Sequence, residues 1–124
     1  MHKNIIANGV PWYDQHNHTV NAHAGCVVKE NDRYYLFGEY KTNDENKFIG
    51  FSCYSSSSLT DWRYEGLALT PQKDGLLGPS RIGERVKVLK HPKSQRFIML
   101  MHTDDLAYND PVIGIAVSDR IDGE

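Results

Sequence analysis

The feature that most constrains the fold of this chain is an internal repeat with a spacing of about 63 residues. The first copy comprises segments 23–29, 33–39 and 48–55, and the second comprises 84–90, 96–102 and 112–118. The segments are offset by 61, 63 and 64 residues, so only the turns between them vary in length. A repeat of this length with several strands in each copy is typical of β-propeller blades.

The repeat predicts an all-β chain, because no amphipathic helical stretch of useful length interrupts it. Strands are expected at 23–29, 33–39, 48–55, 62–69, 84–90, 96–102 and 112–118. We divide the chain into a lead-in at 1–20, a first blade at 21–70 and a second blade at 71–124 that lacks its last strand. One blade cannot bury both of its faces, so the two are expected to stack in one partial propeller domain.

Composition and charge exclude several classes of function. The net charge is -2 and no basic stripe is present, so no nucleic-acid partner is predicted. No hydrophobic run is long enough for a transmembrane segment, so no membrane association is predicted either. The first residues lack the pattern of a signal peptide, which predicts a cytoplasmic protein, or a secreted one if a leader has been removed.

The two cysteines, Cys26 and Cys53, fall on apolar strand patterns. They belong to the first and third predicted strands of one blade, with the second strand between them. Neighbouring strands lie about 4.8 Å apart, so a disulfide across an intervening strand is disfavoured. Two free buried thiols are therefore predicted.

The candidate site residues follow from the repeat. The first strand of each propeller blade lines the central axis, and His23 and Glu84 begin these strands at equivalent positions. They are expected to face one shared pocket, the alternative being two rim residues in solvent. Glu39 ends the second strand of the first blade, with His102 as its repeat partner, and is either a site carboxylate or a solvated strand end.

Carboxylates near a pocket suggest glycosidic bond cleavage, which uses one protonated acid and a second carboxylate as base or nucleophile. Asp104, Asp105 and Asp110 are expected in the loop after the second strand of the second blade, within reach of the rim. Tyr108 in the same loop suits stacking against a sugar face, the alternative being a loop packing residue.

No cofactor and no metal are predicted. His16 and His18, with His23 nearby, have the spacing of metal ligands, but such short pairs are common by chance. The sequence contains no Gly-rich phosphate loop and no Cys-x-x-Cys pair.

Several motifs together resemble glycoside hydrolase family 43, specifically its exo-β-1,3-galactanase-like branch. They are Ala22–Cys26 (Ala-His-Ala-Gly-Cys), Tyr34–Glu39 (Tyr-Tyr-Leu-Phe-Gly-Glu), Cys53–Gly66, Glu84–Val88 (Glu-Arg-Val-Lys-Val) and Met99–Asp119. The resemblance covers nearly the whole chain from Trp12 onward and corresponds to the N-terminal two blades of the family's domain. It implies the first two blades of a five-bladed propeller, the second of them incomplete.

The resemblance also implies roles for the candidate residues. The counterpart of Glu84 lies in the sugar pocket and supports the catalytic acid. The counterparts of Glu39 and Tyr108 contact the terminal galactose, and that of His23 lies at the pocket floor. The catalytic acid of the family is a glutamate of a later blade, which these 124 residues do not include.

The chain departs from the family motifs at three positions. Ala24 and Cys26 stand where the family has glycines, and Val86 stands where it has proline. These changes are expected to narrow the pocket floor slightly.

Two functions are compatible with the sequence. One is a β-galactan-directed glycosidase, or a part of one, that supplies half of the sugar pocket and is inactive as a lone monomer. The other is a non-catalytic propeller fragment that binds carbohydrate and self-associates. A homo-oligomer, dimer or trimer, is expected in either case, because open blade faces and the edge of strand 112–118 remain uncovered.

Overall fold

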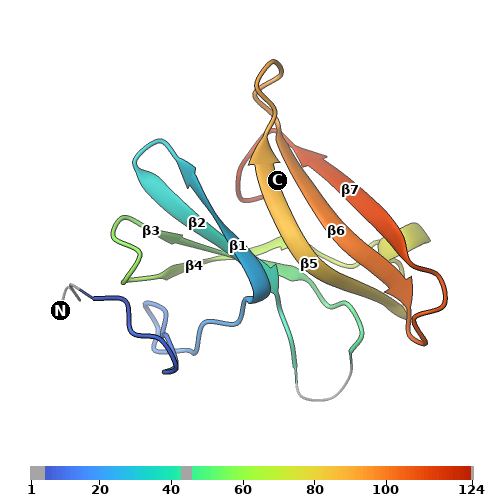
Figure 1. The fold of residues 1–124 in the computed structure, drawn as a ribbon, viewed down its shortest axis with the longest axis horizontal. Helices are drawn as coiled ribbons and strands as arrows, with labels where there is room; N and C mark the ends of the chain where they lie inside the picture. Colours follow the sequence, from blue (N-terminus) through green and yellow to red (C-terminus); the bar gives the residue numbers. More distant parts are fainter. Residues whose placement is uncertain (1–4, 43–45, 124) are drawn as a thin grey trace.

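The computed structural model describes residues 5–42 and 46–123, which form two antiparallel sheets that stand against each other (Figure 1). In the first sheet the order is β1 (His23–Glu30), β2 (Arg33–Glu39), β3 (Phe51–Ser56) and β4 (Arg63–Leu69). After a short 3-10 turn, η1 (Gly75–Leu77), the second sheet contains β5 (Arg81–Lys90), β6 (Phe97–Asp105) and β7 (Val112–Ser118). Residues 1–4 of the predicted lead-in and residue 124 lie outside the described residues.

The predicted fold class is confirmed. Both sheets are meanders in which each strand pairs with the next, as in propeller blades. The 3-10 turn is the one helical element in the part of the chain that the structure describes, and no helix there is able to cross a membrane. The two sheets do not close into a ring, so they are two blades of an open propeller.

The third strand begins later than the alternation of its side chains predicts. It was expected from Phe48 but starts at Phe51, because Gly50 has a φ of 151° that breaks the extended path. The amide of Phe48 instead donates a hydrogen bond to the carbonyl oxygen of Arg81 in β5, at 2.8 Å. The Phe48 ring is buried against Phe51, with 4.8 Å between the ring centroids. Phe48 thus connects the two sheets instead of extending a strand.

The hydrophobic core lies between the two sheets. From the first sheet and its loops it takes Phe37, Phe48, Phe51, Cys53 and Ala68, and from the second and its connection Leu77, Val86, Met99 and Met101. Each of these side chains is at most 8% exposed, so the contact between the sheets excludes water. Burial of this apolar surface fixes how the two blades stack.

The segment that leads into β1 covers part of the other face of the first sheet. All six residues of β3 are buried, which requires cover on both faces. Asn21 provides part of this cover: its backbone amide donates to the Tyr54 hydroxyl, and its carbonyl oxygen accepts from the Ser52 hydroxyl at 2.6 Å. The face of β3 that points away from the second sheet is therefore covered, although an open blade face was expected.

Both cysteines are free thiols, as predicted, but only Cys53 is buried, whereas Cys26 is half-buried. Cys26 in β1 and Cys53 in β3 pair with the same residue, Phe37 of β2, from opposite sides. Burial raises the pKa of Cys53 to about 12, and burial also raises that of Cys26. Both thiols are therefore protonated and poorly reactive at neutral pH.

Candidate functional site

A β-bulge interrupts the first strand of each sheet at the same place in the repeat. The register shifts between His23 and Cys26 in β1 and between Glu84 and Lys87 in β5. The residue inside each bulge has a positive φ, 47° at Ala24 and 56° at Arg85. Bulges bend a strand and redirect the side chains beside them. The strands β1 and β5 contact each other, so these bulges set the direction of both candidate residues at one junction (Figure 1).

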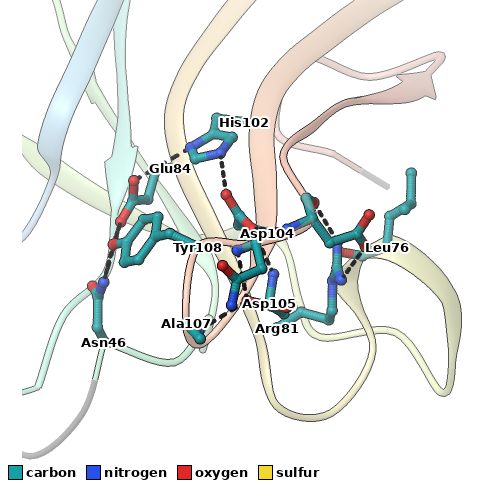
Figure 2. A network of polar contacts seen from close by, with 11 residues as sticks. Asn46, Leu76, Arg81, Glu84, His102, Asp104, Asp105, Ala107 and Tyr108 are labelled. Carbon is teal, nitrogen blue, oxygen red and sulfur yellow. Dashed lines mark hydrogen bonds and ion pairs between the residues drawn. The ribbon is translucent and has the colours of Figure 1, made fainter.

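Glu84 lies at the centre of a polar network (Figure 2). Its Oε1 accepts a hydrogen bond from the Tyr108 hydroxyl at 2.6 Å and another from Asn46 Nδ2 at 3.3 Å. Asn46 Nδ2 also donates to the Tyr108 hydroxyl oxygen. The structure thus brings together Glu84 and Tyr108, two of the four predicted site residues, and adds Asn46 from the loop between β2 and β3.

The network favours the ionised form of Glu84. Burial alone raises the pKa of a carboxyl group, but the hydrogen bonds from Tyr108 and Asn46 outweigh burial and lower the pKa of Glu84. The positive charge of Lys41 and the contact with His102 act in the same direction. The hydrogen bond to Glu84 in turn raises the pKa of the Tyr108 hydroxyl, which therefore stays a donor.

Glu39 joins the same region from the other sheet. It is a buried carboxylate, 6% exposed, at the end of β2. Its Oε2 accepts a hydrogen bond from the backbone amide of Arg85 at 3.3 Å, and its Oε1 lies 3.2 Å from Lys41 Nζ. Lys41 Nζ donates to Asn46 Oδ1 at 2.7 Å, so polar contacts continue from Glu39 to Glu84. A plain solvated strand end would not be buried in this way.

Gly38, which precedes Glu39, allows the chain before β1 to pass close to β2 at this site. A side chain at Gly38 would place its Cβ 2.3–2.5 Å from backbone atoms of Ala22, which crosses closely over β2. Only glycine permits that approach. His23, which follows Ala22, is exposed and pairs with Glu39 in the β1–β2 register, so it lies at the same end of the first sheet.

All three aspartates, Asp104, Asp105 and Asp110, were expected in a loop, and for the first two that expectation is wrong. Asp104 and Asp105 belong to β6, where they pair with Ile82 and Arg81 of β5. Asp104 is 1% exposed, and its Oδ1 accepts the backbone amides of Asp105 and Asp110, both at 2.9 Å. These bonds satisfy a buried carboxylate and let the strand continue to Asp105, three residues beyond its expected end at residue 102.

The loop that carries Tyr108 is ordered by the same aspartates. Asp105 Oδ1 accepts the backbone amides of Ala107 and Asn109, at 2.9 and 3.0 Å. Asp110 forms an ion pair with Arg81 of β5, with 2.7 Å between Oδ2 and Nη1. Tyr108 itself has a φ of 59° and is 48% exposed, so its ring is presented to solvent while its hydroxyl holds Glu84.

Asn46, Lys41 and His102 were not among the predicted site residues, and Asp104 was expected only as a loop carboxylate within reach of the rim. Asn46 and Lys41 lie in or next to a polar loop, and nothing in their spacing marks them. His102 did carry a signal, because it is the repeat partner of Glu39. Asp104 follows His102 by two residues, and alternate residues of a strand share a face, so a longer predicted strand would have placed them together.

The His16 and His18 pair shows a structural arrangement. Their backbone amides both donate to Asp14 Oδ1, at 2.8 and 3.0 Å, and the centroids of the two rings are 6.2 Å apart. Within residues 5–42 and 46–123, no three side chains of His, Cys, Asp or Glu gather closely enough to hold a metal ion.

The site is equipped for hydroxyl recognition more than for proton donation. An ionised Glu84 accepts hydrogen bonds, which the hydroxyl groups of a sugar are able to donate. It has no proton to donate to a leaving group. The exposed Tyr108 ring supplies an apolar surface of the kind that stacks on sugars.

Comparison with solved structures gives the same picture. The exo-β-1,3-galactanase from Phanerochaete chrysosporium, solved with β-1,3-galactotriose, matches 95% of this chain with a TM-score of 0.91 and 30% identity. The exo-β-1,3-galactanase 1,3Gal43A from Clostridium thermocellum matches 98% of it with a TM-score of 0.90 and 33% identity. A putative exo-β-1,3-galactanase from Bifidobacterium bifidum s17 matches 90% of it with a TM-score of 0.85 and 35% identity.

The chain spans only part of these proteins, namely 28%, 26% and 37% of their respective lengths. A GH43 β-1,3-galactosidase solved with galactodeoxynojirimycin is similar at a TM-score of 0.87 and 33% identity. No family model matches the sequence, and no curated protein does. The similarity in structure extends over nearly the whole chain and includes both blades described above. The chain therefore belongs to glycoside hydrolase family 43, in its exo-β-1,3-galactanase-like branch, and corresponds to part of that fold.

Proposed function

We propose that this chain forms one half of the sugar pocket of a β-galactan-directed, exo-acting glycosidase. In this proposal Glu84 and Glu39 accept hydrogen bonds from hydroxyl groups of a terminal galactose. Tyr108 stacks on the sugar or orients Glu84, and His23 borders the pocket floor. The substrate is a β-1,3-linked galactoside, the ligand class bound by the similar galactanase.

The observation that carries this proposal is the arrangement around Glu84. Glu84 and Tyr108 come from separate parts of the second sheet and meet at 2.6 Å, while Asn46 reaches the same carboxylate oxygen from the first sheet. Buried carboxylates cost free energy unless they are well paired, so a network of this kind at an open end of the sheets favours a binding role.

In the same proposal, the group that protonates the leaving oxygen comes from outside these two blades. A general acid needs a raised pKa, whereas the pKa of Glu84 is lowered. Glu84 supports such an acid by its negative charge and by its contacts with the sugar. The 124 residues alone are therefore expected to bind a galactoside and to hydrolyse it little or not at all.

Titration of the chain with β-1,3-galactotriose, followed by NMR chemical shifts and by calorimetry, tests the binding role. Binding that weakens by about tenfold or more in Glu84→Gln is expected, because a hydrogen-bonded charge is lost. Asp119→Asn, at a site that is 80% exposed and pairs with Arg96, is the matched control and should bind like the wild type. The absence of any shift at the Asn46, Glu84 and Tyr108 amides at millimolar sugar would refute the proposal.

A second candidate function, a self-associating carbohydrate-binding module, is favoured by the exposed face of β7. Ile113, Ile115 and Val117 alternate along this strand and are 75%, 67% and 49% exposed. Within the described residues β6 is the only strand that pairs with β7, so no strand covers the other edge of β7. Ile5 and Ile6 lie beside Trp12 and Leu59 at the far side of the first sheet and do not cover this edge (Figure 1).

A second copy of the chain is the proposed occupant of this face, and light scattering tests it. A mass of two or three times 14.1 kDa is expected at micromolar concentration. Ile115→Lys should shift the mass toward 14.1 kDa, whereas Leu106→Lys, at a loop residue that is 50% exposed, should not. A monomeric wild type would leave the first proposal standing and remove the second.

A further inference from the structure

We propose that His102 is a positioning residue for Glu84 and that Asp104 holds it in place. The three side chains form a continuous row of contacts, carboxylate to imidazole to carboxylate (Figure 2). His102 Nδ1 lies 3.4 Å from Glu84 Oε2, and His102 Nε2 lies 3.0 Å from Asp104 Oδ2. The inference rests on the proposed sugar-binding role of Glu84 and adds to it the residues that fix the carboxylate.

The row joins a buried carboxylate, Asp104, to the partly exposed pair of His102 and Glu84. The side chain of Asp104 is 2% exposed, that of Glu84 14% and that of His102 28%. Asp104 is fixed by two backbone amides on Oδ1, so its other oxygen has one direction available, toward the imidazole. An anchored carboxylate that orients a histidine, which then orients the functional group, is a recurring way to build a precise site.

His102 supplies the contact on the second carboxylate oxygen of Glu84. Tyr108 and Asn46 both act on Oε1, which leaves Oε2 to His102. Without this contact the carboxylate plane is free to rotate about its terminal bond, because two donors on one oxygen do not fix the other. In the neutral ring only one nitrogen carries hydrogen, so both carboxylate contacts are hydrogen bonds only in the doubly protonated ring.

The register of the second sheet makes this geometry possible. Glu84 and His102 are direct cross-strand partners in the β5–β6 ladder. The bulge follows immediately after Glu84 and turns the chain so that its carboxylate stays beside the imidazole. His102 and Asp104 are alternate residues of β6 and share a face. The row is therefore held by backbone pairing.

Two substitutions of His102 separate its two contacts. Asparagine places its amide nitrogen near the position of Nδ1, so His102→Asn retains a donor toward Glu84. Glutamine reaches the position of Nε2, so His102→Gln retains a donor toward Asp104 and loses the one toward Glu84. Both variants keep a neutral polar side chain at a half-buried position, and far-UV circular dichroism confirms that each folds.

The decisive readout is the titration of the Glu84 side-chain carboxyl carbon, followed by ¹³C NMR in the 124-residue chain. We expect the pKa of Glu84 to rise in His102→Gln and to stay closer to its wild-type value in His102→Asn. In parallel, His102→Gln should lose about tenfold in affinity for β-1,3-galactotriose, and His102→Asn less than about threefold.

An unchanged Glu84 titration in His102→Gln would overturn the inference, and so would a His102→Asn variant that titrates like His102→Gln. The titration needs no sugar, so it judges the positioning role even if galactotriose fails to bind. Failure of the wild type to bind galactotriose, with the titration as expected, would reject the proposed function and keep the positioning role.

Discussion

Two strands at the same place in the repeat, β3 and β7, have opposite surroundings. Phe51 in β3 and Ile115 in β7 are 64 residues apart and occupy equivalent positions. Phe51 is fully buried between the two sheets, whereas Ile115 is 67% exposed. The repeat therefore places an apolar side chain on the same face of each blade, and only the first blade has a described neighbour to cover it. The apolar pattern of a strand therefore shows which face can pack against a neighbour, and does not show whether that neighbour is present.

The largest expected effect comes from truncating these two equivalent side chains. Phe51→Ala should lower the free energy of unfolding by about 3–5 kcal/mol, because it leaves a cavity in the core between the sheets. Ile115→Ala should change it by less than about 0.5 kcal/mol in the monomer, because the side chain is already in water. Urea unfolding at low protein concentration measures both. Equal losses would show that β7 is covered after all.

Repeating the Ile115→Ala measurement at high protein concentration sharpens the same comparison. If a second copy covers β7, the loss grows with concentration, because association adds to the stability of the wild type only.

The second comparison is between His23 and Glu84, which occupy equivalent positions. A smaller effect on the free energy of unfolding is expected here, from Glu84. His23 is exposed, whereas Glu84 lies in a network that lowers its pKa. A lowered pKa in the folded state stabilises the fold above the ordinary pKa of glutamate. That stability disappears as the pH falls through the folded value. The free energy of unfolding should therefore fall as the pH drops below about 5, and less steeply in Glu84→Gln than in the wild type.

Unfolding by urea at a series of pH values measures this slope. Asp119→Asn is the control, because Asp119 is exposed and far from the network. A Glu84→Gln variant with the slope of the wild type would mean that the network does not stabilise the carboxylate.

The smallest expected effect concerns the two bulges. Ala24 and Arg85 are equivalent residues with positive φ, a conformation that costs a residue with a Cβ about 1–2 kcal/mol. Ala24→Gly removes this strain but adds freedom to the unfolded chain, so a net gain of about 0.5–1 kcal/mol is expected. Arg85→Gly should gain a similar amount, because the Arg85 side chain is exposed and its backbone amide still reaches Glu39.

Thermal unfolding of both glycine variants checks this expectation. A loss of stability in Ala24→Gly would show that the alanine methyl group makes a contact that offsets the strain.

The sequence was sufficient to predict the strands because each blade is local: every strand pairs with its neighbour in the chain. It failed where the reason is a contact that the repeat does not show, with the other blade for Phe48 and with the residues that follow it for Asp104. Phe48 continues the alternation of β3 on paper, yet it leaves the strand because its amide and ring find partners in and against the second sheet. Asp104 looks like a loop residue until the amides of Asp105 and Asp110 are seen to satisfy it.

The residues of the candidate site also fall into two groups, those that the sequence predicted and those that it did not. Glu84 and Tyr108 could be predicted because the motifs around them resemble those of a known family. Asn46 could not, because its role depends on where a polar loop of the first sheet ends in space. His102 was visible as a repeat partner, but its part in the site depends on the bulge beside Glu84.

Asn46 has one more consequence for this protein. It belongs to the first repeat, and the carboxylate that it contacts belongs to the second. A single repeat therefore does not contain the whole network, and under the proposed function the smallest unit that binds the sugar is a pair of repeats. Any ligand that contacts both Asn46 and Glu84 connects the two blades and stabilises the contact between them. Occupancy of the site should then slow hydrogen exchange along β1 and β5, far beyond the few atoms that touch the sugar.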